Sequence, residues 1–473
     1  MKPRLTWLTP ALLVLALAAC AAPKPVPTPQ VAFTSPSEGA VVHGPRTVTV
    51  QVALVDALPT ATIDVTTDAR SHSSNRTGDT LEVELELKDH LNSLTVTVAN
   101  PGQPVPGTAT LHLDYPFLTL SDQQAASVVI GQPDFVTDTE ADPTKTIWSP
   151  YVRPLVMDGV LYLSDYSQGR VMGYDTVPTA NGAAADFVLG KSDFLDTDST
   201  PGPAKMDGPQ TLATDGRRMY VIDYSWNRIL RYDTQPTTDG ASADHVIGQP
   251  DFTTTASATS STRLNHPESM FIAAGKLIVA DSGNNRVLIW SEVPNAIDVP
   301  ADIVLGQPDM VSGDANRGGP VGAATLYDPT DVWSDGQRLV VTDGGNNRVL
   351  IWNTFPTVDG APADVVLGQP DMTSDAPGLA DDSLDYPYSL HSNGNQLFVA
   401  DSDNNRVLVW DSFPSSNGQV PDRVLGQPDF VTGAFELSQS GLAFPTGVYV
   451  DGNRLFVADN DNLRYLIFVG AEE

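Results

Sequence analysis

A chain of 473 residues is too long to bury one ordinary core, so several domains or a repeat array are expected. Asp and Glu number 58 against 26 Lys and Arg, a formal net charge of −32, and this surface repels phosphate groups. We therefore expect no nucleic-acid binding; the charge favours cations or basic partners, or serves only to keep an exported protein dispersed.

Residues 1–19 have the form of a secretory signal peptide. Lys2 and Arg4 supply positive charge before an apolar run, residues 8–19, that is too short to span a bilayer. The run ends in Leu-Ala-Ala-Cys20, which resembles the lipobox of bacterial lipoproteins. The resemblance implies cleavage before Cys20 and acylation of its thiol and amino group. The alternative is a simple cleaved signal in which the Cys stands by chance.

Lipidation of Cys20 would decide both localisation and redox chemistry. Cys20 is the only cysteine of the chain, so acylation consumes the thiol and leaves no disulfide to stabilise the fold. Two or three acyl chains would give stable membrane anchoring. We expect an exported protein tethered to the membrane by lipid at Cys20. Ala21, in place of Asp, indicates the outer membrane if the host has one.

Residues 20–30 and 31–116 are predicted to form a linker and a small domain. Pro occupies four of the nine positions from 21 to 29, which favours an extended, semi-rigid spacer. Beyond it apolar and polar residues alternate, as in residues 47–54 and 81–87, so one face of each strand is expected in a core. Such strands predict a β-sandwich. The opening segment, residues 33–39, resembles bacterial immunoglobulin-like envelope domains, which implies a spacer or an adhesive module.

From Ser127 onward the chain repeats with a period of about 60 residues. The tetrapeptide GQPD, altered to GKSD in one copy, begins at Gly131, Gly190, Gly248, Gly306, Gly368 and Gly426. In the unit that ends at Gly368, three strand-like runs precede a fourth, Asp364–Gly368. Four short strands in each recurring unit predict the blades of a β-propeller.

A second signature is an Asp followed by four turn-prone residues and an Arg. It recurs as Asp165/Arg170, Asp223/Arg228, Asp281/Arg286, Asp343/Arg348, Asp401/Arg406 and Asp459/Arg464. Gly and Asn between the two tolerate the backbone of a tight turn, so each pair is expected to meet across a hairpin. An aromatic residue follows each Arg by four positions. Recurrence in all six units favours packing between blades over catalysis.

These patterns resemble the NHL-repeat family, and Ala280–Trp290, ADSGNNRVLIW, is close to its strand, D-x-x-x-N-R turn and strand. The resemblance spans residues 127–470 and implies an all-β, six-bladed propeller over residues 120–473, with four strands in each blade. The run Ser127–Gly131 precedes the first hairpin, and nothing follows the last one. We expect that run to supply the missing outer strand and close the ring. NHL propellers include binding scaffolds and catalytic relatives, so the fold does not choose between them.

The candidate ligand site is one mouth of the central channel. The residue after the Pro that begins each innermost strand is expected there, together with two neighbours. The set is Tyr151, Arg153, Gln210, Glu268, Thr330, Asp331, Tyr388 and Thr446. Its hydroxyl, amide and carboxylate groups could bind a small polar ligand; the alternative is that they hold ordered channel water.

Calcium is the one metal that the turns suggest. Oxygen ligands gather at Asp401, Asp403, Asp459 and Asp461, as they do in Ca²⁺ loops. Neither segment continues into the Gly and distant Glu of an EF-hand loop, so plain hairpins without a cofactor are the favoured interpretation.

Enzymatic alternatives have weaker support. Six-bladed lactonase-like enzymes use Glu, Asn and Asp around Ca²⁺, and Glu268 and Asp331 lack a matching Asn. The amidating lyases use His ligands for Zn²⁺, whereas His245, His266 and His391 occupy unrelated repeat positions. We assign no catalytic residue.

The sequence therefore predicts a lipid-anchored protein of the bacterial cell envelope. We expect a monomer that presents its propeller to an unidentified protein or small-molecule ligand. The competing hypotheses are a metal-dependent envelope hydrolase or lyase of the six-bladed type and a purely mechanical spacer.

Overall fold

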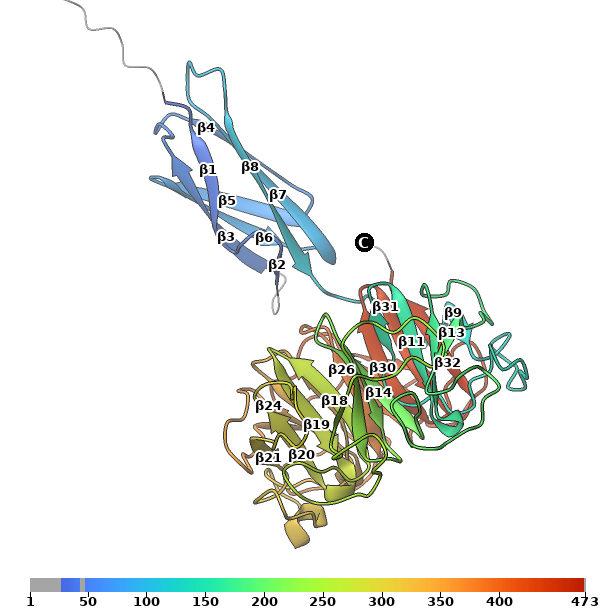
Figure 1. The fold of residues 1–473 in the computed structure, drawn as a ribbon. Coiled ribbons are helices and arrows are strands. Elements are labelled where there is room, and N and C mark those ends of the chain that lie inside the picture. The colour runs from blue at the N-terminus through green and yellow to red at the C-terminus, as the bar shows by residue number, and fades with distance from the viewer. Residues whose placement is uncertain (1–26, 43–46, 472–473) are drawn as a thin grey trace, which may run out of the picture. The chain divides into compact units, whose positions relative to one another are not determined.

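A computed structural model describes residues 27–42 and 47–471, and the chain divides into two compact units (Figure 1). The predicted signal peptide and Cys20 lie outside the described residues. Within the described part, no helix combines the length and the apolar character needed to cross a membrane.

The first unit is a β-sandwich of two four-stranded sheets. One sheet has the order β1 (Gln30–Ser35), β3 (Thr47–Val55), β6 (Thr80–Glu86) and β5 (Ser71–Thr77). The other has the order β2 (Ala40–Val41), β8 (Gly107–Tyr115), β7 (His90–Ala99) and β4 (Thr62–Thr67). Strand β6 illustrates why these segments pack as two sheets around a core. Leu81, Val83 and Leu85 are buried while the glutamates between them are exposed, because side chains alternate along a strand.

The second unit contains six four-stranded antiparallel sheets, and in the first five the strands follow one another along the chain from the innermost to the outermost position. The first three are β10 (Leu155–Met157), β11 (Val160–Asp165), β12 (Arg170–Tyr174) and β13 (Phe187–Leu189); β14 (Pro209–Thr214), β15 (Met219–Asp223), β16 (Arg228–Tyr232) and β17 (His245–Ile247); and β18 (Pro267–Ala273), β19 (Lys276–Asp281), β20 (Arg286–Trp290) and β21 (Ile303–Leu305). The last three are β22 (Pro329–Ser334), β23 (Leu339–Asp343), β24 (Arg348–Trp352) and β25 (Val365–Leu367); β26 (Pro387–Ser392), β27 (Leu397–Asp401), β28 (Arg406–Trp410) and β29 (Arg423–Leu425); and β30 (Pro445–Asp451), β31 (Arg454–Asp459), β32 (Arg464–Val469) and β9 (Val128–Ile130).

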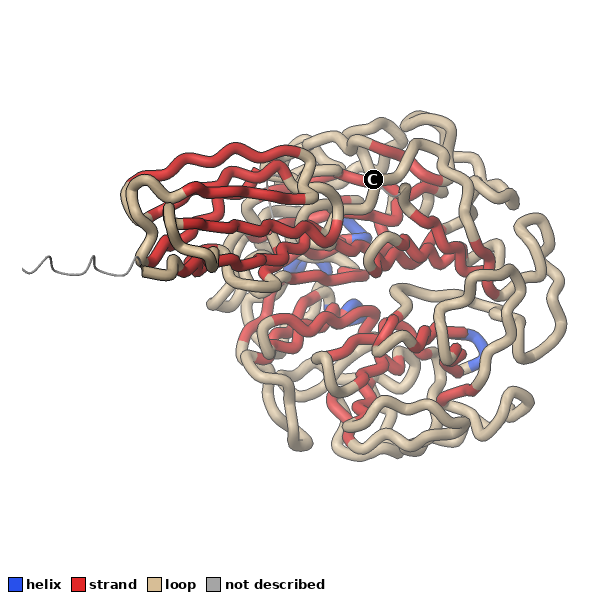
Figure 2. Tube along the Cα trace, turned by 90° about the horizontal axis from the view of Figure 1, so that it is seen from above, coloured by secondary structure: helices blue, strands red, loops and turns tan. Residues whose placement is uncertain are grey.

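Helical structure in the described residues is limited to single turns between strands (Figure 2). These 3₁₀ turns are η1 (Tyr166–Gln168), η2 (Ser282–Asn284), η3 (Ala315–Gly318) and η4 (Gly344–Asn346). Three of them, η1, η2 and η4, form the hairpin between the second and third strands of a blade.

Shared hydrophobic clusters close the six sheets into a ring. Each cluster joins buried side chains of consecutive sheets, and the sixth and first sheets meet through Ile467, Leu163 and Met172. Strand β9, from the N-terminal side, pairs with β32, with Val129 opposite Leu466. The predicted all-β fold, a propeller preceded by a sandwich, is therefore confirmed, and so is closure of the ring by the leftover strand.

The GQPD segment ends each outer strand and fastens it to a neighbouring turn. Its Gly follows the last strand residue directly and has a φ between 77° and 97° in all six copies, a range that favours Gly. In one copy the Gln307 amide donates to the carbonyl oxygens of Asn285 and Asp314, both at 2.9 Å. Asp309 then accepts the backbone N–H of Val311 at 2.9 Å. The segment is structural in every blade, as predicted, although the role of Gln was not foreseen.

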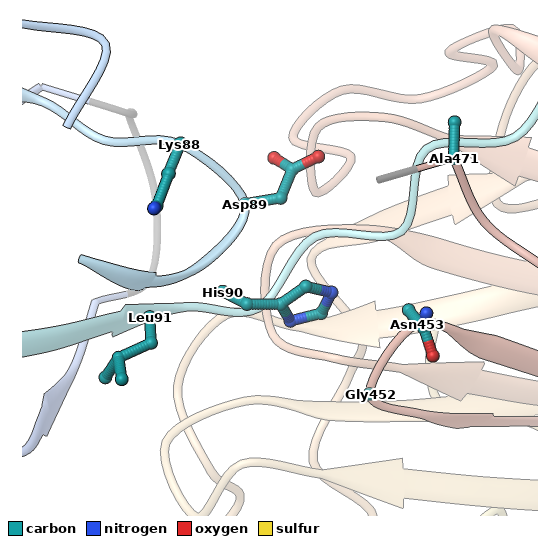
Figure 3. Close-up of a pocket in the computed structure, with 7 residues that line it drawn as sticks. All are labelled: Lys88, Asp89, His90, Leu91, Gly452, Asn453 and Ala471. Atoms are coloured by element: carbon teal, nitrogen blue, oxygen red, sulfur yellow. The ribbon is translucent and has the colours of Figure 1, made fainter. Parts of the chain in front are cut away.

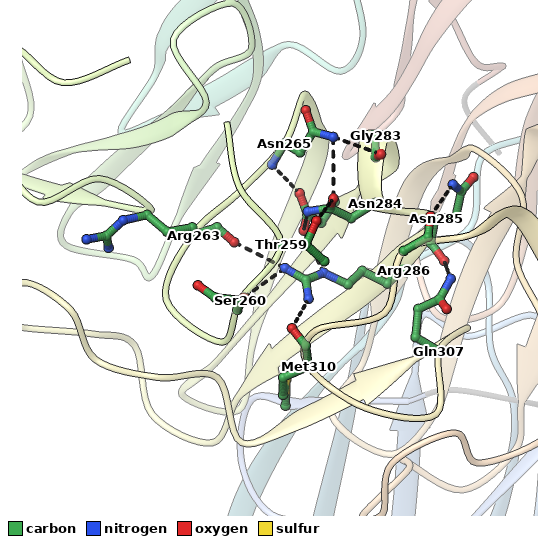
Figure 4. A network of polar contacts seen from close by, with 12 residues as sticks. Thr259, Ser260, Arg263, Asn265, Gly283, Asn284, Asn285, Arg286, Gln307 and Met310 are labelled. Atoms are coloured by element: carbon green, nitrogen blue, oxygen red, sulfur yellow. Dashed lines mark hydrogen bonds and ion pairs between the residues drawn. The ribbon is translucent and has the colours of Figure 1, made fainter. Parts of the chain in front are cut away.

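A buried ion pair spans the hairpin of every blade, as the spacing of Asp and Arg predicted. The Arg Nε to Asp Oδ2 distances are 2.7–2.9 Å, and no partner is more than 5% exposed. Arg286 also donates to the carbonyl oxygens of Met310 at 2.7 Å, Ser260 at 2.8 Å and Arg263 at 3.1 Å (Figure 4). These carbonyls lie in the loops that enter and leave the blade, so one guanidinium holds both loops to the hairpin.

Asparagines complete the same network. Asn284 donates its amide to Asp281 Oδ2 at 2.8 Å, and Asn285 takes the left-handed conformation with φ 51° and donates to the Gly313 carbonyl at 2.8 Å (Figure 4). Asn tolerates this backbone conformation better than most residues, which explains its recurrence before the Arg.

Loss of one of these arginines should destabilise the propeller severely. Arg348→Leu leaves the fully buried Asp343 carboxylate without its cation, and we expect the free energy of unfolding to fall by about 3–5 kcal/mol. Arg454→Leu, which breaks a pair whose members are 32% and 30% exposed, should cost about 0–1 kcal/mol. Urea unfolding followed by Trp fluorescence measures both, because six of the seven tryptophans lie in the propeller. Equal losses in the two variants would contradict the prediction.

Candidate functional site

The starts of the innermost strands meet at one end of the propeller channel. The Pro that begins an innermost strand pairs with the Asp of its own hairpin, as Pro329 does with Asp343, and Pro150 forms the corresponding bridge with Asp165. The residues that flank these prolines therefore share one mouth with the hairpin turns.

Glu268 and Tyr388 form the centre of this mouth. The Tyr388 hydroxyl donates to Oε2 of Glu268, and the two residues are 3% and 7% exposed respectively. Burial, together with the carboxylates of Asp328 and Asp331, raises the pKa of Glu268 to about 8. The Glu268 carboxyl is therefore mostly protonated at neutral pH, and its contact with Tyr388 joins two blades that are not neighbours.

A series of aromatic rings extends from this pair around the mouth. Tyr151 lies edge-on to Tyr388 with a centroid distance of 5.3 Å, and Tyr166 lies 5.1 Å from Tyr151. Tyr224 follows at 5.9 Å from Tyr166, and His266 at 4.8 Å from Tyr224. Such spacings are typical of interacting rings, so five side chains from four blades form one continuous surface.

On its other side Tyr388 contacts Tyr386, whose ring lies 6.0 Å away. The Tyr386 hydroxyl donates to Oδ2 of Asp328 at 2.7 Å, and burial raises the pKa of that carboxyl. We call the whole group the tyrosine mouth. Its members are Tyr151, Tyr166, Tyr224, His266, Glu268, Asp328, Tyr386 and Tyr388.

Five members of the tyrosine mouth were not among the predicted site residues. Tyr166 and Tyr224 directly follow the Asp of a hairpin pair, while His266, Asp328 and Tyr386 directly precede the Pro of an inner strand. Both positions were already fixed by the repeat, so extending the comparison by one residue on either side would have found them.

The two predicted threonines and Gln210 behave differently from the tyrosines. The hydroxyls of Thr330 and Thr446 donate to the carbonyl oxygens of Pro387 and Pro150, each at 3.1 Å, and so join neighbouring inner strands. Gln210 is 2% exposed, and its Oε1 has no hydrogen-bond partner among the residues that the structure describes. The threonines therefore serve packing between blades.

Arg153 and Asp331 lie below the mouth in a separate polar cluster. Arg153 Nη2 is 3.6 Å from Asp331 Oδ1, and the side chains are 2% and 0% exposed. Arg153 also donates to the Met270 carbonyl at 2.7 Å, and Asp331 accepts the hydroxyls of Ser269 and, at 2.7 Å, Ser389. These groups come from the first, third, fourth and fifth blades, so the cluster ties the ring together across its axis.

The predicted calcium ligands divide into two kinds. Asp401 and Asp459 are the acidic partners of buried hairpin pairs at 2.7 Å, and each also accepts a hydrogen bond from an Asn amide. Asp403 and Asp461 lie on the same turns and, with Phe444, line a surface pocket. In residues 27–42 and 47–471, no group of three or more His, Cys, Asp or Glu could hold a metal ion.

A further pocket contains none of the predicted site residues (Figure 3). All of its lining residues belong to the second unit, which includes Lys88–Leu91 at the start of β7 although the rest of that strand belongs to the sandwich. The lining consists of Lys88, Asp89, His90, Leu91, Gly452, Asn453 and Ala471.

Comparisons with known proteins give fold neighbours only. No protein-family model and no curated protein matches the chain. The PQQ-bound aldose sugar dehydrogenase of Streptomyces coelicolor is 13% identical with a TM-score of 0.39, covering 68% of this chain and 96% of that one. A putative 6-phosphogluconolactonase of Bacteroides fragilis is 11% identical with a TM-score of 0.38, covering 82% and 98%. Both TM-scores are below 0.5, so the propeller assignment depends on the sheets described above.

The raised pKa of Glu268 predicts a specific pH dependence of stability. The folded state holds a proton that an unfolded carboxyl, with a pKa near 4.5, has lost. Its stabilising contribution is therefore complete below about pH 4.5 and is lost as the pH rises through about 8. The free energy of unfolding of the wild type should decline between pH 6 and pH 9. We expect Glu268→Gln to remove about 2–3 kcal/mol of that decline.

Thermal unfolding at the two pH values measures this difference. Glu292→Gln, at an exposed position, is the matched control and should follow the wild type. If the Glu268→Gln and wild-type melting temperatures change in parallel, Glu268 is ionised in the folded state and the assignment is wrong.

Proposed function

We propose that this protein is a lipid-anchored binding protein of the bacterial cell envelope. Its NHL-like propeller uses the tyrosine mouth to hold a small polar ligand or a polar side chain of a protein partner. The observation that carries the proposal is the convergence of aromatic rings and two carboxyl groups from five blades on one mouth of the channel.

The exposure of the rings supports a binding role. His266 is exposed, and Tyr166, Tyr224 and Tyr386 are partly exposed, so ring faces are accessible while Glu268 and Tyr388 remain buried beneath them. Aromatic walls with a few convergent polar groups are the usual composition of ligand sites. A protonated Glu268 can donate one hydrogen bond and accept another, which suits a neutral polar group.

The remaining parts of the chain support presentation at a membrane surface. A Pro-rich linker at residues 20–30 and an immunoglobulin-like sandwich would separate the propeller from a lipid attached to Cys20. The strongly acidic composition keeps the same module away from anionic lipid headgroups.

The anchor can be tested by replacing its acceptor. Cys20→Ala should transfer the protein from the membrane fraction to the soluble fraction, because no acyl chain can then be attached. Fractionation followed by immunoblotting measures the distribution, and mass spectrometry of the mature N-terminus identifies the acyl groups. Membrane association that persists in Cys20→Ala would refute lipid at this residue as the tether.

The mouth can be tested by site-specific photocrosslinking in cells. A photoreactive amino acid at Tyr224 should give one discrete adduct, a protein or a small molecule detected by mass, that disappears in a Glu268→Ala background. The same amino acid at Gln337, an exposed position at the far end of an inner strand, is the control. Identical adducts from both positions, or an adduct unaffected by Glu268→Ala, would contradict binding at the tyrosine mouth.

A further inference from the structure

A separate pocket lies at the end of the inner strands opposite the tyrosine mouth. It has a volume of about 170 Å³ and is formed within the propeller by residues from several blades. Phe271, His391 and Tyr449 each stand four positions after the Pro that begins their strand, so the pocket is remote from the tyrosine mouth along the channel axis. We call it the distal pocket.

The walls of the distal pocket are mainly apolar. The lining includes Leu155, Leu212, Ile272 and the rings of Phe271 and Tyr449. Leu155 and Leu212 are at most 4% exposed and belong to the core cluster between the first two blades, which fixes this wall. Engineered cavities of about 150 Å³ with such linings accept benzene, so the distal pocket suits a molecule with a body of that size.

His391 supplies a hydrogen-bond donor to the pocket. It is 8% exposed, and its Nδ1 accepts the backbone N–H of Val450 at 3.2 Å. That contact places the proton of the neutral ring on Nε2, at the opposite edge. No hydrogen bond from Nε2 is found among the described residues, and this atom is not one of the fully enclosed unpaired polar atoms, so its N–H remains accessible to a molecule in the pocket.

Arg153 contributes a charge that is already balanced. Its guanidinium lies 5.0 Å from the centre of the Phe271 ring and 3.6 Å from the Asp331 carboxylate. Burial and the charge of Arg153 lower the pKa of His391 well below its usual value, so the imidazole is neutral at physiological pH. An anionic ligand would add an uncompensated buried charge, whereas a neutral acceptor would add none.

We propose that the distal pocket binds a small neutral carbonyl compound with an apolar body about the size of a benzene ring, whose oxygen accepts the N–H of His391. The bound body fills the space between Phe271, Tyr449 and the leucine wall. This site is separate from the tyrosine mouth, and its occupancy does not depend on the function proposed for that mouth.

Three probes of similar size test the proposal on the full chain. Acetophenone carries the carbonyl group, ethylbenzene replaces it by a methylene group, and benzoate replaces it by an anion. We expect acetophenone to bind with a dissociation constant at least about tenfold lower than either of the others, because only it offers an acceptor to the His391 N–H without adding charge. NMR titration of the His391 ring nitrogens measures binding at this residue specifically, since Nε2 should shift on contact with the carbonyl.

Two variants localise the effect. Ile272→Trp fills the pocket from its partly exposed side and should abolish the acetophenone response, while Gln168→Trp at the other end of the channel should leave it unchanged. His391→Leu should make acetophenone and ethylbenzene equivalent. If that variant does not fold, the three probes on the wild type still decide the question.

Ethylbenzene binding as tight as acetophenone binding would overturn the role of His391. Benzoate binding tighter than acetophenone binding would overturn the proposal that the ligand is neutral. Absence of any shift at His391 up to the solubility limit of acetophenone, or an Ile272→Trp variant that responds like the wild type, would overturn the site itself.

Discussion

The ion pair between Asp and Arg in each hairpin is the interaction on which the rest of the propeller depends. A charge in a protein interior is costly unless it is paired and its remaining hydrogen-bonding groups are satisfied. Arg286 meets that condition, since its Nε binds Asp281 and its Nη atoms reach three carbonyl oxygens in two loops. Because every blade repeats this arrangement, the long connecting loops are held in place by hydrogen bonds to a buried guanidinium.

The same pairs position the candidate site. Tyr166 and Tyr224 are the next residues after Asp165 and Asp223, so the turn that each ion pair fixes also fixes the ring at the mouth. The opposite wall depends on the inner strands, where the residues before and after Pro387 supply Tyr386 and Tyr388. The hairpin ion pair recurs in every blade, but the side chains that it positions at the mouth differ from blade to blade. These differing side chains give the mouth its chemistry.

Recurrent features could be predicted from the sequence because six copies report the same local geometry. The hairpin pairs, the ends of the outer strands and the closing strand at Val129 are of this kind. Contacts across the ring are not, since Glu268 with Tyr388 and Arg153 with Asp331 join residues more than a hundred positions apart whose meeting depends on the diameter of the channel. The predicted ligand site therefore combined residues of the tyrosine mouth with residues of the Arg153–Asp331 cluster that lies below it.

A bulge lies at the start of the inner strands, beside the residues that follow each Pro. The pairing of β22 with β23 shifts register between Pro329 and Asp331, and the same shift occurs in other blades. Side chains at the same position after this bulge nevertheless differ, because Thr330 donates to the Pro387 carbonyl of the next blade whereas Glu268 and Tyr388 meet at the mouth. Simple alternation along a strand does not predict this outcome.

Closure by β9 also determines how the propeller would respond to mechanical load. Before it reaches β9 the chain is already hydrogen-bonded to the fifth sheet, where Val424 of β29 pairs with Asp122 and Gln123, so a pull on the preceding segment loads that sheet as well as β9. Strand β9 is held by a three-residue ladder to β32, and its removal would leave the sixth sheet with three strands and an open edge. The ring would then open at one defined seam while the other five sheets, each formed from a continuous segment, kept their strands.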